Sequence, residues 1–433
     1  MKARSRPMRS MPLLTLGSIG LIAVSGSTNA VAGDVRSPQV AGVATVQNDA
    51  PTFYGDVVVI LQESCQVCHQ PERPNLGGVI APMSLVTYEE TRRWASSIAE
   101  KVEARLMPPW HASREFRGRF VNERYLEDHE IETLVAWAES GALAGNPADA
   151  PPPLALNEAG SSDSWTIGEP DLVIPIPSYM VSDELTDDYI YQRVTISADM
   201  LPEDRWIKAV EFRAGGSYVH HIVGGVLGGT APGYGPFYYP NNVSRTLRTG
   251  STIRFEVHYH KESGPGTAVL DQSFAAIQFY EPGEVVKNVM RTTSLGIMDF
   301  EIPPGDPNYT DSSEFLFEED SYIHFMNPHM HLRGKSARYV LTYPDGRQEP
   351  LLYVPQYDFG WQHNYYLNEP LFVPAGTKVT LTLWWDNSAD NPTNPDPTAT
   401  VTYGAPTTDE MGFGWLHWTE AEARNIVVGE SLR

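Results

Sequence analysis

The sequence has little cysteine, little positive charge and no long apolar run beyond its start. With 2 cysteines in 433 residues it has no disulfide framework, so its core must hold without covalent cross-links. Lys and Arg number 31 against 54 Asp and Glu, and the net charge of −23 argues against a nucleic-acid partner. No stretch after residue 32 is apolar enough to cross a membrane.

Residues 1–32 have the layout of a secretory signal peptide. Four basic residues within the first nine precede an apolar run over residues 11–24, and Ala30, Val31 and Ala32 supply small side chains for cleavage. A short membrane anchor is the alternative, but the run is too short to span a bilayer comfortably. We expect a periplasmic or secreted protein without a transmembrane segment. Cleavage would remove the four basic residues and change the net charge from −23 to −27.

The first part of the mature chain, residues 51–145, is predicted to be helical. Thr87 and Glu90 have the spacing of a capping box, and a helix is expected over residues 91–106. Apolar side chains recur on one face of residues 129–142, which predicts another helix. This part therefore favours a small helical domain.

The second part of the chain is predicted to be all β. Residues 146–164 are rich in Pro, Gly, Ala and Ser without periodicity, which is typical of an interdomain linker. After them, short segments alternate between apolar and polar residues, as strands of sandwiches or barrels do. The length allows two sandwich domains, residues 165–284 and residues 285–433, with a seam near residues 280–288.

The segment "CQVCH" is a haem attachment signal. Cys65 and Cys68 would bond covalently to one haem c, and His69 would be an axial ligand of its iron. A zinc site or a redox dithiol are the alternatives. However, the chain has no second cysteine pair for zinc, and no thioredoxin-like pattern surrounds the motif.

The sixth ligand of such a haem has three candidates, Met83, Met107 and His111. We favour Met107, because Pro108 and Pro109 would hold the chain extended beside it after a helix. The order of helices, haem motif and methionine over residues 51–145 resembles a class I cytochrome c. The expected fold is therefore multidomain, with an all-α class I cytochrome c domain followed by an all-β part.

Histidines of the β part occur in pairs whose spacing suits metal binding. In "STIRFEVHYH" strict alternation puts His258 and His260 on the polar face of one strand. His329 and His331 in "PHMH" would also project together from an extended segment. The adjacent pair in "SYVHHIVGG" could bind one metal only if the backbone bends there, which the flanking glycines permit.

Taken in order, "HH", "HYH", "HMH" and "DEM" resemble the copper type II, ascorbate-dependent monooxygenases. This family includes dopamine β-hydroxylase and peptidylglycine α-hydroxylating monooxygenase. The resemblance covers roughly residues 170–425. It implies that the all-β part consists of two all-β jelly-roll-like sandwich domains, each of which holds one copper ion. It implies these ligands for the first copper: His220, His221 and His258, with His260 in competition with His258. It implies these for the second: His329, His331 and Met411.

The resemblance also implies a division of work between the two coppers. The site of His329, His331 and Met411 would be catalytic and activate O2, because a thioether favours Cu(I). The site with three histidines would store and deliver an electron. Where the peptide-amidating members hold a substrate carboxylate, this chain has Asn327, Phe413 and Trp415. A peptide C-terminus is therefore not expected as substrate, and a more apolar one is favoured.

The predicted function is that of an exported haem- and copper-containing monooxygenase, an oxidoreductase that uses O2 to hydroxylate a C–H bond of a small molecule. The haem part, tethered by a flexible linker, would supply electrons in place of ascorbate or another redox donor, or alongside it. One alternative is a non-catalytic periplasmic electron-transfer protein with a copper-binding β module. Another is a scaffold protein whose histidines are simply solvated.

Overall fold

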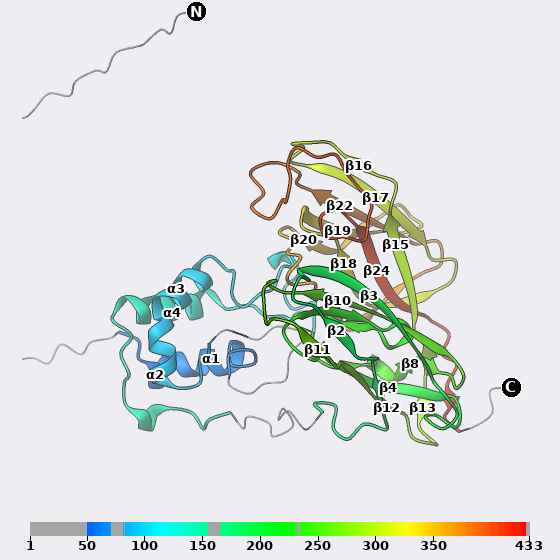
Figure 1. Ribbon diagram of the computed structural model, residues 1–433, viewed down its shortest axis with the longest axis horizontal. Helices are drawn as coiled ribbons and strands as arrows, with labels where there is room; N and C mark the ends of the chain where they lie inside the picture. Colours follow the sequence, from blue (N-terminus) through cyan, green and yellow to red (C-terminus); the bar gives the residue numbers. More distant parts are fainter. Residues whose placement is uncertain (1–49, 71–80, 82, 155–164, 232–233, 430–433) are drawn as a thin grey trace, which may run out of the picture. The chain divides into compact units, whose positions relative to one another are not determined.

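The computed structural model describes residues 50–433 except 71–80, 82, 155–164, 232–233 and 430–433. The predicted signal peptide lies outside the described residues, as does most of the predicted linker. Figure 1 shows helices in the early, blue-to-cyan part of the chain and strands in the rest. No helix within the described ranges is long and apolar enough to cross a membrane.

The helices are short. They are α1 (Val58–Ser64), α2 (Tyr88–Thr91), α3 (Ala95–Glu103) and α4 (Asp128–Glu139), with single turns at η1 (Phe53–Val57), η2 (Arg92–Trp94), η3 (Arg114–Phe116), η4 (Pro147–Asp149), η6 (Gly225–Leu227) and η7 (Pro240–Asn242). The predicted capping box is confirmed, because Thr87 and Glu90 bond reciprocally at the start of α2. The helix predicted over residues 91–106 begins within α2, passes through η2 and ends with α3 at Glu103.

The first pair of sheets packs around a core of buried residues between Ile174 and Met290. One sheet has the order β1 (Leu172–Pro175), β12 (Phe274–Phe279), β4 (Arg205–Arg213) and β7 (Phe237–Tyr238), with β9 (Thr246–Leu247) also on β4. The other has the order β3 (Asp187–Thr195), β10 (Thr252–His260), β5 (Val219–Val223) and β6 (Gly229–Thr230).

The second pair of sheets packs around a core that runs from Leu295 to Leu416. One of its sheets has the order β15 (Arg291–Ile297), β24 (Gly412–Glu420), β18 (Ser321–His329) and β21 (Tyr365–Val373). The other has the order β17 (Tyr309–Leu316), β22 (Lys378–Trp385), β19 (Gly334–Thr342) and β20 (Gln348–Val354). Small pairs complete the fold: β2 (Tyr179–Val181) with β11 (Val269–Asp271), β13 (Val285–Val286) with β25 (Ile426–Val427), β14 (Asn288–Val289) with β8 (Val243–Ser244), and β16 (Glu301–Ile302) with β23 (Val401–Thr402).

The prediction of an all-α class I cytochrome c domain, and with it the fold class stated above, is wrong. The described chain is mostly β-sheet, and its longest helix, α4, has 12 residues. A large piece of the expected domain instead belongs to the second sandwich. Trp110, Phe116 and Phe120 are buried in the same core as the strands from Leu295 onward. Local sequence periodicity could not reveal this packing, because its partners lie more than 200 residues away.

This piece, which we call the strap (residues 110–125), is fixed to β20 and β21 by backbone hydrogen bonds. Ser113 N donates to Tyr353 O at 2.7 Å, and Val121 N donates to Tyr366 O at 2.9 Å. Arg119 adds an ion pair with Glu349 at 3.0 Å. Residues 110–125 are therefore joined directly to the second sandwich.

Replacing Phe120 by alanine is expected to lower the free energy of unfolding by about 3–5 kcal/mol, since a buried phenyl ring is removed from a packed core. Phe120 is 3% exposed, whereas its neighbour Val121 is 70% exposed. Val121→Ala should therefore stay within about 0.5 kcal/mol of the parent in the same denaturant titration. Equal stabilities for the two variants would show that the strap is not part of this core.

Candidate metal centre

A bulge in the first sandwich brings three histidines to one point. In the pairing of β10 with β5, His258 lies opposite His221, but the next residue, Tyr259, lies opposite Val219. His220 is thus the extra residue of a β-bulge, and both members of the adjacent pair can face His258. A bend in the backbone was the condition for both histidines to bind one metal. The bend is present, and it lies at His220 and not at the flanking glycines.

The Nδ1 atoms of these three side chains form a small triangle. The separations are 3.3 Å for His220–His221, 3.2 Å for His220–His258 and 3.4 Å for His221–His258. The centre of this triangle lies about 1.9 Å from each nitrogen, close to the metal–imidazole bond length of about 2.0–2.1 Å. A ring nitrogen carries either a proton or a lone pair, so three such contacts cannot all be hydrogen bonds. A cation at the centre would remove the remaining repulsion.

Asp187 at the start of β3 orients His258. Its carboxylate accepts a hydrogen bond from His258 Nε2, which leaves the Nδ1 lone pair directed at the triangle. Thr407 Oγ1 donates to the other oxygen of Asp187 at 2.5 Å. Burial alone would raise the pKa of Asp187, but the bonds from His258 and Thr407 outweigh burial and lower it to about 2. The carboxylate is therefore charged at neutral pH.

Burial lowers the pKa of two histidines of this group, His220 and His258. Desolvation, followed by the proximity of His221 and His258, lowers the pKa of His220 to about 2. Desolvation also lowers the pKa of His258, against the opposing bond from Asp187. Neutral imidazoles with free lone pairs are what metal binding requires.

His258, and not His260, belongs to this group. His258 is 1% exposed. The side chain of His260 is 66% exposed, and its Nδ1 atom lies 3.9 Å from Asp187 Oδ1. The geometry therefore favours His258 over His260 as the predicted ligand.

Asp187→Asn is expected to weaken metal binding at this group by about 10- to 100-fold, the usual effect of losing a partner that orients a ligand. A competitive copper titration would measure the change. Asp188→Asn is the matched control, because the Asp188 carboxylate is exposed and accepts a hydrogen bond from the neighbouring Tyr189 N at 2.8 Å. If both variants bind copper as the parent does, Asp187 has no part in the site.

The second group lies at the end of β18. The rings of His329 and His331 are 5.3 Å apart and perpendicular. Both Nδ1 atoms are engaged, His329 with Gln362 Oε1 at 2.6 Å and His331 with Asp409 O at 3.2 Å. The bond to Gln362 leaves Nε2 of His329 as the nitrogen that could bind a metal. Burial, with a contribution from His331, lowers the pKa of His329 to about 3, and burial lowers that of His331 to about 4.

A buried carboxylate, that of Glu410, joins the backbone amide of Met411 to this group. Glu410 Oε2 accepts hydrogen bonds from His331 N at 2.8 Å and Met411 N at 3.3 Å. Burial raises the pKa of Glu410 to about 7, although bonds from Arg333 N and His331 N oppose the rise. In the sheet, His329 pairs with Phe413, two residues after Met411. The backbones that carry the three predicted ligands are thus joined.

Two features connect the first group with the second. The ring of Phe359 stacks on His220 at 5.1 Å and meets His331 edge-on at 5.6 Å. The segment before β24 contacts both groups, since Thr407 bonds Asp187 and Asp409 bonds His331. The groups therefore share one neighbourhood between the two sandwiches.

The haem motif forms a turn after α1. Cys68 N and His69 N both donate to Cys65 O, at 3.0 and 2.9 Å. His69 Nδ1 lies 3.2 Å from Met83 O, and a hydrogen bond there leaves Nε2 free for an iron ligand. Burial, with smaller effects of Cys68 and Glu130, raises the pKa of Cys65 to about 12. So high a pKa is unsuited to a redox dithiol, which needs a thiolate.

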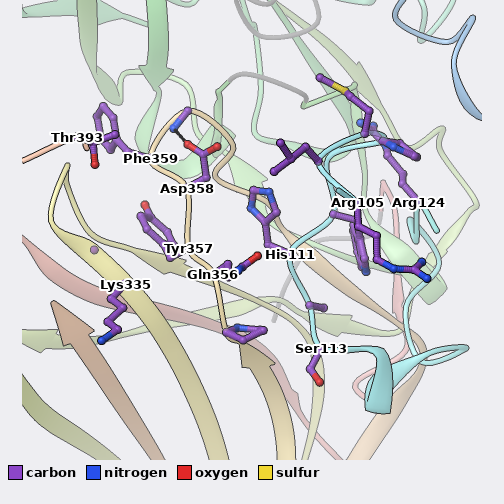
Figure 2. Close-up of a pocket in the computed structure, with 18 of the residues that line it drawn as sticks. Arg105, His111, Ser113, Arg124, Lys335, Gln356, Tyr357, Asp358, Phe359 and Thr393 are labelled. Carbon is purple, nitrogen blue, oxygen red and sulfur yellow. Dashed lines mark hydrogen bonds between the residues drawn. The ribbon is translucent and has the colours of Figure 1, made fainter. Parts of the chain in front are cut away.

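Met107 follows α3 and lines a cavity of about 1060 Å³. Leu332 and Phe359, which neighbour the second group, line the same cavity. Figure 2 shows Phe359, His111 and Arg105 on its walls. Met107, the predicted sixth ligand of the haem, therefore lines the same cavity as residues that neighbour the histidine groups. His111, which is a residue of the strap, packs against His363 with the two rings 5.8 Å apart.

Comparisons with known proteins identify no family for this chain. No protein-family model matches it, and no curated protein matches it. Similar solved structures include the turret protein A223 of Sulfolobus turreted icosahedral virus, at 10% identity over 57% of this chain and 98% of that chain with a TM-score of 0.14. They also include VP2 of infectious bursal disease virus (9%, 58% and 72%, 0.18) and the PBCV-1 virus capsid (8%, 59% and 96%, 0.20). Likenesses this weak carry no conclusion about function.

Proposed function

We propose that this protein is an exported copper monooxygenase that uses O2 to hydroxylate a C–H bond and receives electrons from a haem bound at Cys65, Cys68 and His69. The observation that carries the proposal is the triangle of Nδ1 atoms from His220, His221 and His258, whose separations suit a bound metal. Its neighbour, the pair of His329 and His331, supports a second metal close by.

The donor sets fit copper. Three imidazoles suit copper in both oxidation states, and two imidazoles with the sulfur of Met411 favour Cu(I). Copper bound at the two groups would supply the one-electron chemistry with O2 that hydroxylation needs. The role of the protein is to orient the imidazoles, through Asp187 at the first group and Gln362 at the second. Burial, which lowers the pKa of His258 and His329, favours their neutral forms.

The surroundings of the second group support an apolar substrate. The ring of Trp415 lies 5.7 Å from that of His329, and Phe413 stacks on Trp415 at 5.7 Å. Asn327 carries no charge to attract a substrate carboxylate. Its amide nitrogen already donates to Tyr234 Oη at 2.6 Å and to His363 O at 2.7 Å. An aromatic wall beside His329 would hold a substrate by apolar contact.

Electrons from the haem would reach the copper groups within one chain. Attachment in one chain raises the local concentration of the donor near the copper. The hydrogen bonds of the strap to β20 and β21 support this idea, since they join the part of the chain that follows the haem motif to the second sandwich.

The proposal is tested by metal content and oxygen uptake together. The exported protein should contain two copper ions and one haem, and with a reductant it should consume O2 and hydroxylate at least one member of a panel of apolar C–H compounds. Two coppers with no hydroxylated product would favour the alternative, an electron-transfer protein with a copper-binding module. A protein that contains no copper would contradict both.

A further inference from the structure

Asp271, the last residue of β11, is a buried carboxylate that belongs to neither histidine group. It is 1% exposed. Two neutral hydroxyl groups donate hydrogen bonds to it. Tyr259 Oη lies 2.9 Å from Oδ2, and Ser273 Oγ lies 3.1 Å from Oδ1 and 3.0 Å from Oδ2. Burying a carboxylate costs free energy, whereas an apolar side chain would fill the same space without that cost. The presence of this carboxylate therefore points to a role other than packing.

On one side, Asp271 is bonded to the strand that carries His258. Tyr259 follows His258 directly in β10 and is fully buried. Its ring stacks with the ring of Tyr179 at 5.3 Å and with that of Tyr218 at 6.5 Å. Because the ring is packed in this way, the hydrogen bond from its hydroxyl group to Asp271 fixes the backbone of β10 beside His258.

On the other side, Asp271 is bonded to the segment that leads into the bulge at His220. Ser273 Oγ, which donates to Asp271, accepts a hydrogen bond from Gly215 N at 3.0 Å. A methyl group in place of the Gly215 hydrogen would lie 2.1 Å from Asp271 Oδ1, so the carboxylate packs directly against this backbone. Gly215 precedes His220 by five residues. The carboxylate thus joins the two chain segments that meet at the triangle of Nδ1 atoms.

The bulge needs support of this kind, because the extra residue of a bulge has no partner in the strand ladder. Two backbone hydrogen bonds lie beside it, from Val219 N to Gly216 O at 3.1 Å and from His260 N to Tyr218 O at 2.9 Å. Both of them end before His220. The place of this side chain relative to β10 therefore depends on contacts outside the ladder.

We propose that Asp271 is a positioning residue of the first histidine group, which holds His258 in place through Tyr259 and His220 through Ser273. The inference rests on the proposed function, and it deepens it by naming the residues that keep the three-histidine site assembled. Asp271 acts through the backbone of the two segments and not as a ligand. A buried polar network that is fully hydrogen-bonded selects one arrangement of its surroundings. The first group should therefore keep its affinity for copper only while both arms of this network are intact.

Two substitutions test the arms separately, because each removes one hydroxyl group. Tyr259→Phe keeps the stacked ring and loses the donor to Asp271, whereas Ser273→Ala loses the link to Gly215 N. Competitive titration with Cu(II) should show that one of the two copper ions binds about tenfold or more weakly in each variant, as for other changes behind a metal ligand. The affected ion should be the one that His258→Ala removes. The ion at the second group should bind as in the parent.

Tyr339→Phe is the matched control. Tyr339 is also fully buried, but it lies in the second sandwich, and its hydroxyl group has no hydrogen-bond partner among the described residues. Its replacement should leave both copper affinities unchanged. The double variant of Tyr259→Phe and Ser273→Ala should lose little more affinity than either single variant, because one broken arm already frees the bulge. A network that served only the stability of the fold would lower the midpoint of unfolding and leave the copper affinity of the folded protein unchanged.

The outcomes separate this inference from the proposed function. If the parent binds two copper ions and Tyr259→Phe and Ser273→Ala bind them as Tyr339→Phe does, the positioning role of Asp271 is wrong while the proposed function stands. Losses that add fully in the double variant would also contradict it, since the two arms would then act independently. If the parent binds no copper at the first group, the proposed function itself is wrong.

Discussion

Met411→Ala is expected to abolish O2-dependent hydroxylation. In the proposed function the thioether is the soft ligand of the second group, and without it only two imidazoles would remain to hold Cu(I). The loss of product formation should exceed the about 10- to 100-fold caused by changes behind a metal ligand. Oxygen uptake and product analysis with the substrate found for the parent would measure it. The haem spectrum and the copper at the three-histidine group should be unaffected.

Met180→Ala is the matched control for this experiment. Met180 lies on β2 and is 56% exposed, so its thioether is not part of a buried group of ligands. Its replacement should leave hydroxylation at the parental rate. If Met411→Ala retains that rate as well, Met411 is an ordinary packing residue and the assignment of the second site is wrong.

His258→Ala is expected to reduce the copper content from two ions to one per chain and to stop catalysis although the second group is intact. His258 is 1% exposed and bonded to Asp187, so its loss removes one corner of the triangle and leaves that carboxylate without its buried donor. The variant should also lose the stabilisation that copper gives at this group, about 2.7 kcal/mol at a free copper concentration 100 times the dissociation constant. Metal analysis and thermal unfolding with and without copper would measure both effects.

His260→Ala separates this prediction from a general effect of removing histidine. His260 is two residues further along β10, and its side chain is 66% exposed. This variant should bind two copper ions and retain activity. Loss of copper from His260→Ala, with normal binding in His258→Ala, would reverse the assignment of the ligand.

The strands of the β part were predictable because their alternation is local. Ile253, Phe255 and Val257 were expected on one face of β10, and all three are buried. The burial of the strap in the second sandwich was not predictable in the same way. The helices themselves follow local patterns, but the aromatic residues of the strap have no periodicity that would indicate their burial beneath strands formed 200 residues later.

The histidine groups were predictable from pairing and order, whereas the residues that orient them were not. Asp187 occupies the first position of a strand rich in polar residues, and nothing in its neighbourhood marks it as the partner of His258. Gln362 and Phe359 lie in a segment without regular structure, and their contacts with His329 and His220 arise only when the chain has folded. One signal was present, since His363 adds a further histidine beside this segment.

X-ray diffraction from crystals of the copper-loaded protein, recorded on both sides of the copper absorption edge, tests the central claim most directly. The account predicts two anomalous copper peaks per chain, one among the Nδ1 atoms of His220, His221 and His258 and one beside His329, His331 and Met411. A crystal with iron as its only metal, or with copper bound elsewhere while these six side chains point apart, would contradict it.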